Sequence, residues 1–202
     1  MRLIVIDGLD ASGKSTQAHL LARYLSEQGM SVCIRTHPSD DNLFGVYAGR
    51  FLYSRGKGAH FASAFFYMFD VFRSIFVYSW QKYDYTIFVR YLMGAAYLPP
   101  PLHKYAYRFF AVLVPRSGDM FFIDVTPEDA YERIVQKRDR REMFEDIASL
   151  RKVRDRVLSL TGIGGWIVVD GGRSPGEVEA DIRRRLDIKD VGQMRANRPV
   201  RA

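Results

Sequence analysis

The residues with the clearest chemical capability lie near the start of the chain, where Gly8, Gly13, Lys14 and Ser15 have the spacing GxxxxGKS. The two glycines let the backbone curl so that successive N–H groups point at one anion, and a following helix adds free N–H donors. Lys14 can reach the β- and γ-phosphates of a nucleoside triphosphate, and the hydroxyl of Ser15 can bind Mg²⁺. The residues predicted to contact ATP are Gly8, Leu9, Asp10, Ala11, Ser12, Gly13, Lys14, Ser15 and Thr16.

The sequence on either side supports this interpretation of the motif. The apolar run Leu3–Ile6 is typical of a buried strand, and the segment Ser15–Gln28 has a helical pattern. A strand, a glycine-rich turn and a helix together are the context in which the motif binds phosphate, whereas an ordinary glycine turn needs no such flanks. We therefore predict that the chain binds ATP together with Mg²⁺.

Length and composition indicate one globular domain over residues 1–188, followed by a basic tail over residues 189–202. The hydrophobic content of 48% and the charged content of 26% are ordinary for such a domain. Cys33 is the single cysteine, so the chain can form neither a disulfide framework nor a cysteine-based zinc site. We find no signal peptide and no apolar run near the ~20 residues that span a bilayer, so we expect a cytoplasmic protein without a membrane partner.

The formal net charge of +7 raises the question of a nucleic-acid partner. The cations, however, are interspersed with acids between Arg138 and Asp155 or are gathered in the tail. An interspersed pattern is typical of a solvated surface, and a protein that holds a triphosphate also needs cations. Nucleic acid is therefore not expected to be the partner.

The pattern along the chain alternates between strands and helices. Strands are predicted at Leu3–Ile6, Ser31–Arg35, Thr86–Val89, Met120–Asp124 and Trp166–Val169. Helices are predicted at Ser15–Gln28, Ala62–Trp80, Leu102–Val112, Pro127–Lys137, Phe144–Leu160 and Pro175–Leu186. This alternation predicts a doubly wound α/β fold, in which a five-stranded parallel sheet has helices on both faces. Site residues should then follow the carboxyl ends of the strands.

Three further segments carry recognisable patterns. They are Phe69-x-x-x-Arg73 in an aromatic helix, Val89-Arg90-Tyr91 after a strand, and Asp124-Val125-Thr126-Pro127-Glu128 at a helix start. With the phosphate loop, and in this order from Leu3 to about Leu186, these segments resemble thymidylate kinases. The resemblance implies a P-loop kinase fold and the ATP-dependent phosphorylation of a nucleoside monophosphate, most of all dTMP.

In that family, an acid at the position of Asp10 faces the sugar of the acceptor nucleotide, so the resemblance implies a hydrogen bond from the 3′-hydroxyl to Asp10. The alternative for Asp10 is a capping or solvated loop residue. The resemblance also implies that Arg90 holds the acceptor phosphate, for which a guanidinium fork is well shaped. Tyr97 matches an aromatic residue that excludes a ribose 2′-hydroxyl, although its spacing is one residue short. The chain departs from the family at Val89, where an aspartate helps to organise magnesium.

The four-residue step from Phe69 to Arg73 places both side chains on one helix face. The resemblance implies that Phe69 stacks on the base and that Arg73 donates to a ring carbonyl. The alternative is an apolar stripe with a purely structural role. The stripe comprises Phe61, Phe65, Phe66, Phe69, Phe72 and Phe76.

Two residues near the later strands are weaker candidates. Asp124 ends an apolar strand, so it can assist Mg²⁺ through water or cap the following helix. The segment from Val169 to Pro175 matches the family's closing strand and the loop beside the adenine. Arg173 is then a candidate to lie over the base, with a surface arginine as the alternative.

The resemblance also implies an arginine-bearing lid over about residues 136–146. Its cationic cluster comprises Arg133, Lys137, Arg138, Arg140 and Arg141. Phosphoryl transfer develops negative charge at the γ-phosphoryl group, and an arginine that closes over it is an expected solution. Because Ala11 and Ser12 leave the phosphate loop without an arginine, we expect Arg138 or Arg141 to take this role.

We thus expect a nucleoside monophosphate kinase whose catalytic groups are Lys14, Arg90, Arg138 and Arg141. Two alternatives stay open, namely a P-loop kinase with a different phosphorylated acceptor and a nucleotide-binding module with weakened catalysis. A GTPase switch is disfavoured, because the sequence has no Asn-Lys-x-Asp tetrad. The family commonly pairs, and the aromatic helix is a natural surface for a homodimer.

Overall fold

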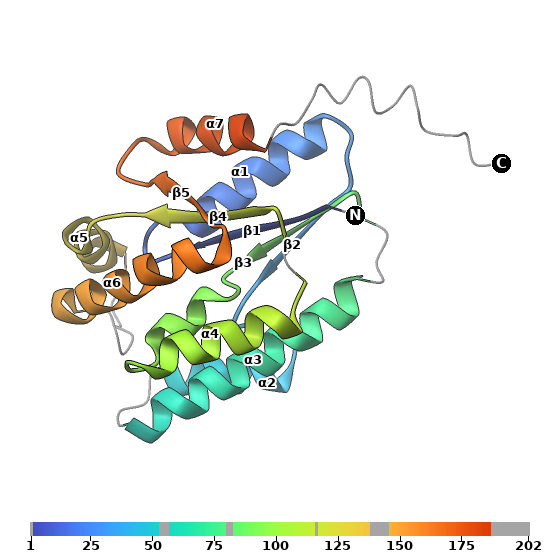
Figure 1. Cartoon of the computed structure of the whole chain (residues 1–202). Coiled ribbons are helices and arrows are strands. Elements are labelled where there is room, and N and C mark those ends of the chain that lie inside the picture. The colour runs from blue at the N-terminus through green and yellow to red at the C-terminus, as the bar shows by residue number, and fades with distance from the viewer. Residues whose placement is uncertain (1, 53–56, 80–82, 116, 138–145, 187–202) are drawn as a thin grey trace.

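The computed structural model describes residues 2–52, 57–79, 83–115, 117–137 and 146–186 (Figure 1). The protein is built around one sheet of five parallel strands in the order β2-β3-β1-β4-β5. The strands are β1 (Arg2–Gly8), β2 (Val32–Thr36), β3 (Tyr85–Val89), β4 (Asp119–Asp124) and β5 (Ile167–Asp170). The predicted α/β fold with a five-stranded parallel sheet is confirmed. Its central strands are apolar because they are buried on both faces.

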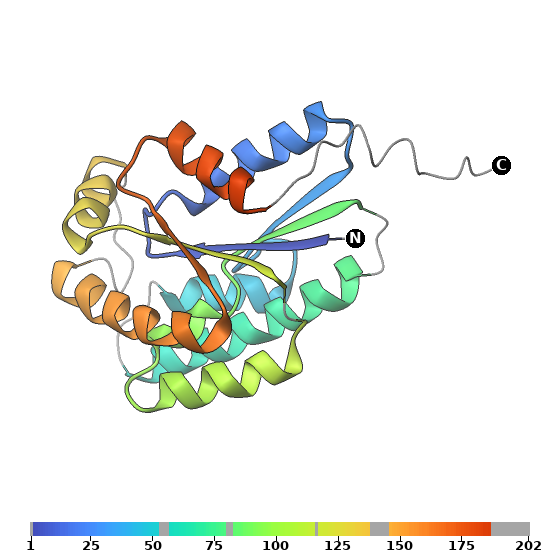
Figure 2. The same cartoon turned by 45° about the horizontal axis from the view of Figure 1, so that its top comes forward.

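Helices cover both faces of the sheet (Figures 1 and 2). On one face lie α1 (Lys14–Glu27) and α7 (Pro175–Arg185). On the other face lie α3 (Lys57–Ser79), α4 (Leu102–Leu113) and α6 (Ile147–Gly164), with α5 (Pro127–Lys137) beside α6. Neighbouring residues of one strand enter opposite cores, so Ile6 packs with α1 and α7, whereas Val5 packs in the core on the other face.

Two elements are not predicted by the sequence pattern, namely α2 (Leu43–Leu52) and the 3₁₀ helix η1 (Met93–Tyr97). Gly45 and Gly49 lower the helix propensity of α2, so its sequence pattern does not predict a helix. A Cβ on Gly45 would lie 2.0 Å from the carbonyl oxygen of Ser39, so glycine is required where α2 passes the preceding loop. The contacts of α2 with that loop and with α3 therefore override its weak local propensity.

Helix α3 contains the stretch Phe61–Tyr78, which is long and apolar enough to cross a bilayer by length and composition. The sequence analysis expected no stretch of this kind, and the structure corrects that expectation. The stretch is 33% buried inside the protein, and its buried face includes the polar residues Asp70 and Ser74, both 0% exposed. A helix that packs in the core of a globular domain meets the same criteria, so α3 by itself does not indicate a membrane span.

The loops that carry the candidate site begin side by side where the central strands end, at the carboxyl ends of the parallel strands (Figure 2). In the register of β1 with β3, Ile6 is paired with Val89, and in the register of β1 with β4, Gly8 is paired with Ile123. The phosphate loop and the loop after β3 therefore leave the sheet next to each other. Parallel α/β sheets bind their ligands at these carboxyl ends of the strands.

His37, directly after β2, is completely buried (0% exposed). Its ring lies edge-on to the rings of Phe88 and Tyr67, with ring centres 5.3 Å and 6.3 Å away. Burial lowers the pKa of His37 to about 4, although the nearby carboxylate of Asp70 opposes this shift. The imidazole is therefore neutral in the folded protein at neutral pH.

We predict that this histidine destabilises the protein in acid. Between pH 6.5 and about pH 4 the unfolded chain binds a proton at His37 while the folded protein does not, so the free energy of unfolding falls as the pH falls. A pKa difference of this size corresponds to roughly 3 kcal/mol. In urea titrations from pH 8 to pH 4, the stability of the wild type relative to His37→Asn should fall by that amount, and a constant difference contradicts the prediction.

Candidate active site

The phosphate loop joins β1 to α1, and its two glycines are required for different reasons. A Cβ on Gly8 would lie 2.3 Å from Oγ of Ser12 and 2.7 Å from the carbonyl oxygen of Ile123, so only glycine fits there. Gly13 caps α1 with φ of +96°, a left-handed conformation that glycine adopts without strain. The start of α1 thus presents its free N–H groups at this loop, as an anion site requires.

The structure brings three predicted site residues together around the carboxylate of a fourth, Asp10, which is 3% exposed. Nζ of Lys14 lies 3.6 Å from Oδ1 of Asp10 and donates a hydrogen bond to the carbonyl oxygen of Leu9 (2.7 Å). The guanidinium of Arg90 donates to the same Oδ1, and the hydroxyl of Tyr97 donates to Oδ2 (3.0 Å). Both oxygens of the carboxylate are therefore engaged, and it holds one cation from each of two loops.

A second buried carboxylate, Asp7, anchors the loop after β3. Oδ2 of Asp7 accepts hydrogen bonds from the backbone N–H groups of Tyr91 (2.8 Å) and Met93 (3.3 Å), and Oδ1 accepts from that of Gly8 (2.9 Å). Burial raises the pKa of Asp7, although these N–H groups favour its ionised form. The sequence analysis did not select Asp7; its only signal is an acid at the end of an apolar strand, directly before Gly8.

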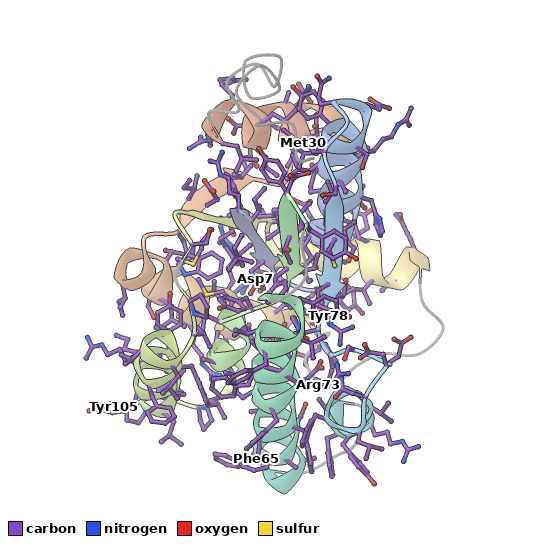
Figure 3. The ribbon with its side chains drawn as sticks, turned by 90° about the vertical axis from the view of Figure 1, so that its right-hand side faces the viewer. Asp7, Met30, Phe65, Arg73, Tyr78 and Tyr105 are labelled. Atoms are coloured by element: carbon purple, nitrogen blue, oxygen red, sulfur yellow. The ribbon has the colours of Figure 1, made fainter. Side chains whose placement is uncertain are left out.

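The two residues proposed to bind a base are Phe69, which contacts α2, and Arg73, which lies on α3 beside the segment before α2 (Figure 3). Phe69 stacks on Phe44 of α2, with ring centres 5.4 Å apart, and remains 41% exposed. Nη1 of Arg73 lies 3.5 Å from Oδ1 of Asp41. Tyr67 of α3 reaches the loop after β3, because its hydroxyl donates to the carbonyl oxygen of Tyr91 (2.9 Å).

The partner of Arg73 belongs to a charged network that the sequence analysis did not identify. Arg35 of β2 donates to both oxygens of Asp41 (2.8 and 2.6 Å), and this pair holds the pKa of Asp41 well below its usual range. Oδ2 of Asp70 accepts a hydrogen bond from the backbone N–H of Ser39 (2.7 Å), and its Oδ1 accepts from the side chain of Asn42 (2.7 Å). These bonds fix the segment after β2 against α3.

The predicted metal residues differ in their surroundings. Asp124, at the end of β4, accepts hydrogen bonds from Nε and Nη2 of Arg154 (2.8 and 2.7 Å). The described part of the chain holds no group of three or more His, Cys, Asp or Glu that could enclose a metal. Mg²⁺ bound to a nucleotide needs no such cage, because phosphates and water supply most of its ligands. Ser15 is exposed beside the phosphate loop, so its hydroxyl fits such an ion, whereas Val89 is buried in the apolar core.

The remaining arginines occupy different places. Arg133 of α5 donates to the carbonyl oxygens of Gly171 (3.1 Å) and Ala11 (3.5 Å), so it links the loop after β5 to the phosphate loop. Arg173 donates to the carboxylate of Asp181 (2.8 Å). Arg138 and Arg141, and with them most of the expected lid over residues 136–146, lie outside the described residues.

With this geometry established, comparison with known proteins decides the family. A sequence model of the family described as thymidylate kinase matches residues 6–182, which is most of the chain. The chain belongs to the thymidylate kinase family. This kinase is therefore a phosphotransferase acting on a nucleoside monophosphate, as the sequence analysis predicted.

Individual relatives agree with this assignment. The kinase is 30% identical to a probable thymidylate kinase of Methanothermobacter thermautotrophicus, over 91% of this chain and 93% of the relative. It is 30% identical to a probable thymidylate kinase of Metallosphaera sedula, over 85% of each chain. Among solved structures, it resembles the thymidylate kinase of Candida albicans with a TM-score of 0.70, at 19% identity, over 94% of this chain and 92% of the other. At this identity, the comparison with the solved structure supports the α/β fold alone.

We predict that Gly8→Ala weakens ATP binding about tenfold or more. The new methyl group would meet Ser12 and the backbone of Ile123, so the phosphate loop must shift, and overpacking of this kind costs about 1–3 kcal/mol. Isothermal titration with ATP measures the effect. Gly176→Ala is the matched control, because a Cβ there meets nothing within 4 Å. Equal ATP affinity of the two variants contradicts the prediction.

Proposed function

We propose that this kinase transfers the γ-phosphoryl group of ATP to the phosphate of dTMP at the cluster around Asp10. The observation that carries this proposal is the meeting of two cations at one buried carboxylate. Lys14 belongs to the phosphate loop and Arg90 to the loop after β3. Two cations that meet in this way suit a donor triphosphate on one side and an acceptor phosphate on the other.

The reaction needs alignment and charge neutralisation more than acid–base catalysis. A phosphate oxygen of the acceptor forms a bond to the γ-phosphorus while the bond from that phosphorus to the β–γ bridging oxygen breaks, which yields ADP. The acceptor phosphate is already ionised near neutral pH, so no side chain has to remove a proton. Lys14 neutralises charge on the β- and γ-phosphates, and the guanidinium of Arg90 holds the acceptor phosphate through parallel N–H donors.

Asp10 and Tyr97 form the proposed sugar side of the acceptor site. Asp10 accepts a hydrogen bond from the 3′-hydroxyl and also orients Lys14 and Arg90. The hydroxyl of Tyr97 lies 3.0 Å from the same carboxylate, which supports a place for its ring beside the sugar, where a ribose 2′-hydroxyl would not fit.

The proposed cofactor is Mg²⁺, which neutralises phosphate charge when it is bound. We assign Ser15 to hold it, because its hydroxyl is exposed beside the phosphate loop. Asp124 contributes indirectly, since both of its oxygens bind Arg154. On the remaining sides of the nucleotides, Arg138 or Arg141 covers the transferred group, and the exposed part of Arg173 contacts the adenine.

Phe69 and Arg73 are the proposed contacts of the thymine base, on the side of α3 that faces the segment after β2.

The second candidate function is the same phosphoryl transfer from ATP to a different phosphorylated acceptor. Two observations favour this second candidate: Val89 is buried in the apolar core where the family has a metal-organising aspartate, and the ion pair of Arg73 with Asp41 places a carboxylate beside the proposed base contact. The cytoplasmic location expected from the sequence stays a prediction.

We predict that Lys14→Ala lowers the rate of transfer about 100-fold or more and leaves the fold intact, because it removes a charge contact of the transition state. The test is a coupled ADP-release assay with ATP, Mg²⁺ and, in parallel, dTMP, dUMP, UMP, CMP, AMP and GMP. Lys152→Ala is the control, because Lys152 is exposed on α6. Turnover that is highest with dTMP supports the proposed acceptor. Retained turnover in folded Lys14→Ala contradicts the role of Lys14.

We also propose that two copies pair through the outer surface of α3 and α4. These helices touch through the rings of Phe72 and Phe110, and their outer surface exposes large apolar side chains. Those with more than half of their surface exposed are Phe65, Phe76, Tyr105, Phe109, Val112 and Leu113, and Figure 3 shows Phe65 and Tyr105 projecting from the two helices. Exposed apolar side chains on two adjacent helices are typical of an interface between subunits.

The double variant Phe109→Glu with Val112→Glu should convert a dimer to a monomer, because it places charge in an apolar interface. Sedimentation velocity measures the change from twice the chain mass of 23.3 kDa to that mass. His19→Glu, at an exposed position of α1 on the opposite face of the sheet, controls for the added charge. A monomeric wild type contradicts the proposed pairing.

A further inference from the structure

The backbone of Arg90 has a conformation that its side chain disfavours. Its φ is +63°, in the left-handed region, where an L residue other than glycine is strained by about 1–2 kcal/mol. Such a conformation persists only when the surrounding bonds determine it. The direction in which the guanidinium leaves the loop depends on this φ, and therefore so does its contact with Asp10.

Hydrogen bonds hold both ends of this residue. The N–H of Arg90 donates to the carbonyl oxygen of Ile6 (3.1 Å), which continues the pairing of β1 with β3. The carbonyl oxygen of Arg90 lies 2.9 Å from Nδ1 of His37. Because a carbonyl oxygen can only accept, the proton must be on Nδ1. The backbone N–H of His37 also donates to the carbonyl oxygen of Val89 (3.0 Å), so His37 spans the peptide just before Arg90 and the carbonyl just after it.

The rest of the imidazole makes no comparable polar contact. Its Nε2 has no hydrogen-bond partner within the described residues, and the ring is completely buried between aromatic side chains. An unpaired buried nitrogen costs free energy, so an apolar side chain of similar size would pack there at less cost. The bond to the carbonyl of Arg90 is what distinguishes histidine from such a side chain.

We propose that His37 is a positioning residue, which fixes the left-handed backbone of Arg90 and so aims its guanidinium at the acceptor phosphate. The proposal rests on the proposed function only in that Arg90 binds that phosphate. Tyr67 performs the equivalent task for the next residue, because its hydroxyl binds the carbonyl oxygen of Tyr91. Together the two side chains satisfy consecutive carbonyl groups of the loop.

The test compares three substitutions that differ in where they place a donor. Asn at position 37 carries its amide nitrogen on Cγ, as Nδ1 is carried in histidine, whereas Gln carries it one bond farther and Leu has none. We expect His37→Leu to raise KM for dTMP about tenfold or more, the effect of losing about one hydrogen bond's free energy. KM for ATP should change less than about twofold. His37→Asn should restore most of the dTMP affinity, and His37→Gln should restore little of it.

Thermal unfolding of each variant separates positioning from folding. Equal rises of KM for ATP and dTMP, or a lower melting temperature with unchanged KM values, would overturn the proposal. If His37→Leu does not fold, the comparison of Asn with Gln decides, and equal dTMP affinity of these two variants also overturns it.

A readout that does not depend on the acceptor keeps this inference separate from the proposed function. The ¹⁵N chemical shifts of the imidazole at neutral pH should show a proton on Nδ1 and none on Nε2, and the opposite tautomer contradicts the inference. Absence of turnover with dTMP in the wild type contradicts the proposed acceptor, whereas the tautomer tests only the bond to Arg90.

Discussion

The burial of the Asp10 carboxylate between Lys14 and Arg90 is the interaction on which the site depends. A carboxylate that is 3% exposed needs compensation, and loss of one partner of a buried ion pair typically costs about 3–5 kcal/mol. The phosphate loop and the loop after β3 are therefore tied to each other by electrostatics as well as by the sheet register. In the proposed function, a phosphate group that enters finds both cations already placed, so little reorganisation is needed at the moment of transfer.

The loop after β3, which carries Arg90 to Asp10, is held by hydrogen bonds from buried side chains to its backbone. Asp7 binds the N–H groups of the loop after β3, and His37 and Tyr67 bind its carbonyl oxygens. Each of these groups comes from a different element, namely β1, the segment after β2, and α3. Because all three are buried, water competes little for the same donors and acceptors. These bonds thus hold the loop in the conformation that gives Arg90 its positive φ.

Sequence alone predicted the parts of the fold and site that follow from local pattern. The parallel sheet follows from apolar runs between helical segments, and the phosphate loop follows from the spacing of Gly8 and Gly13. The helix α2 and the residues Asp7, His37 and Asp41 were not predicted. Their roles arise from contacts across the chain, such as the 53 positions between His37 and Arg90, and no local spacing records such contacts. Arg73 lies on the predicted helix, and its pairing with Asp41 depends on the same long-range placement.

The left-handed conformation of Arg90 lowers the stability of the backbone at the same position whose guanidinium is proposed to bind the acceptor phosphate. Glycine would relax the backbone there without steric cost, yet it carries no guanidinium for a phosphate. Selection for a more heat-resistant chain would therefore favour a change that removes the proposed acceptor contact. In the proposed function, only the phosphate contact offsets the cost of this backbone conformation, so a kinase without that reaction would be free to carry glycine there.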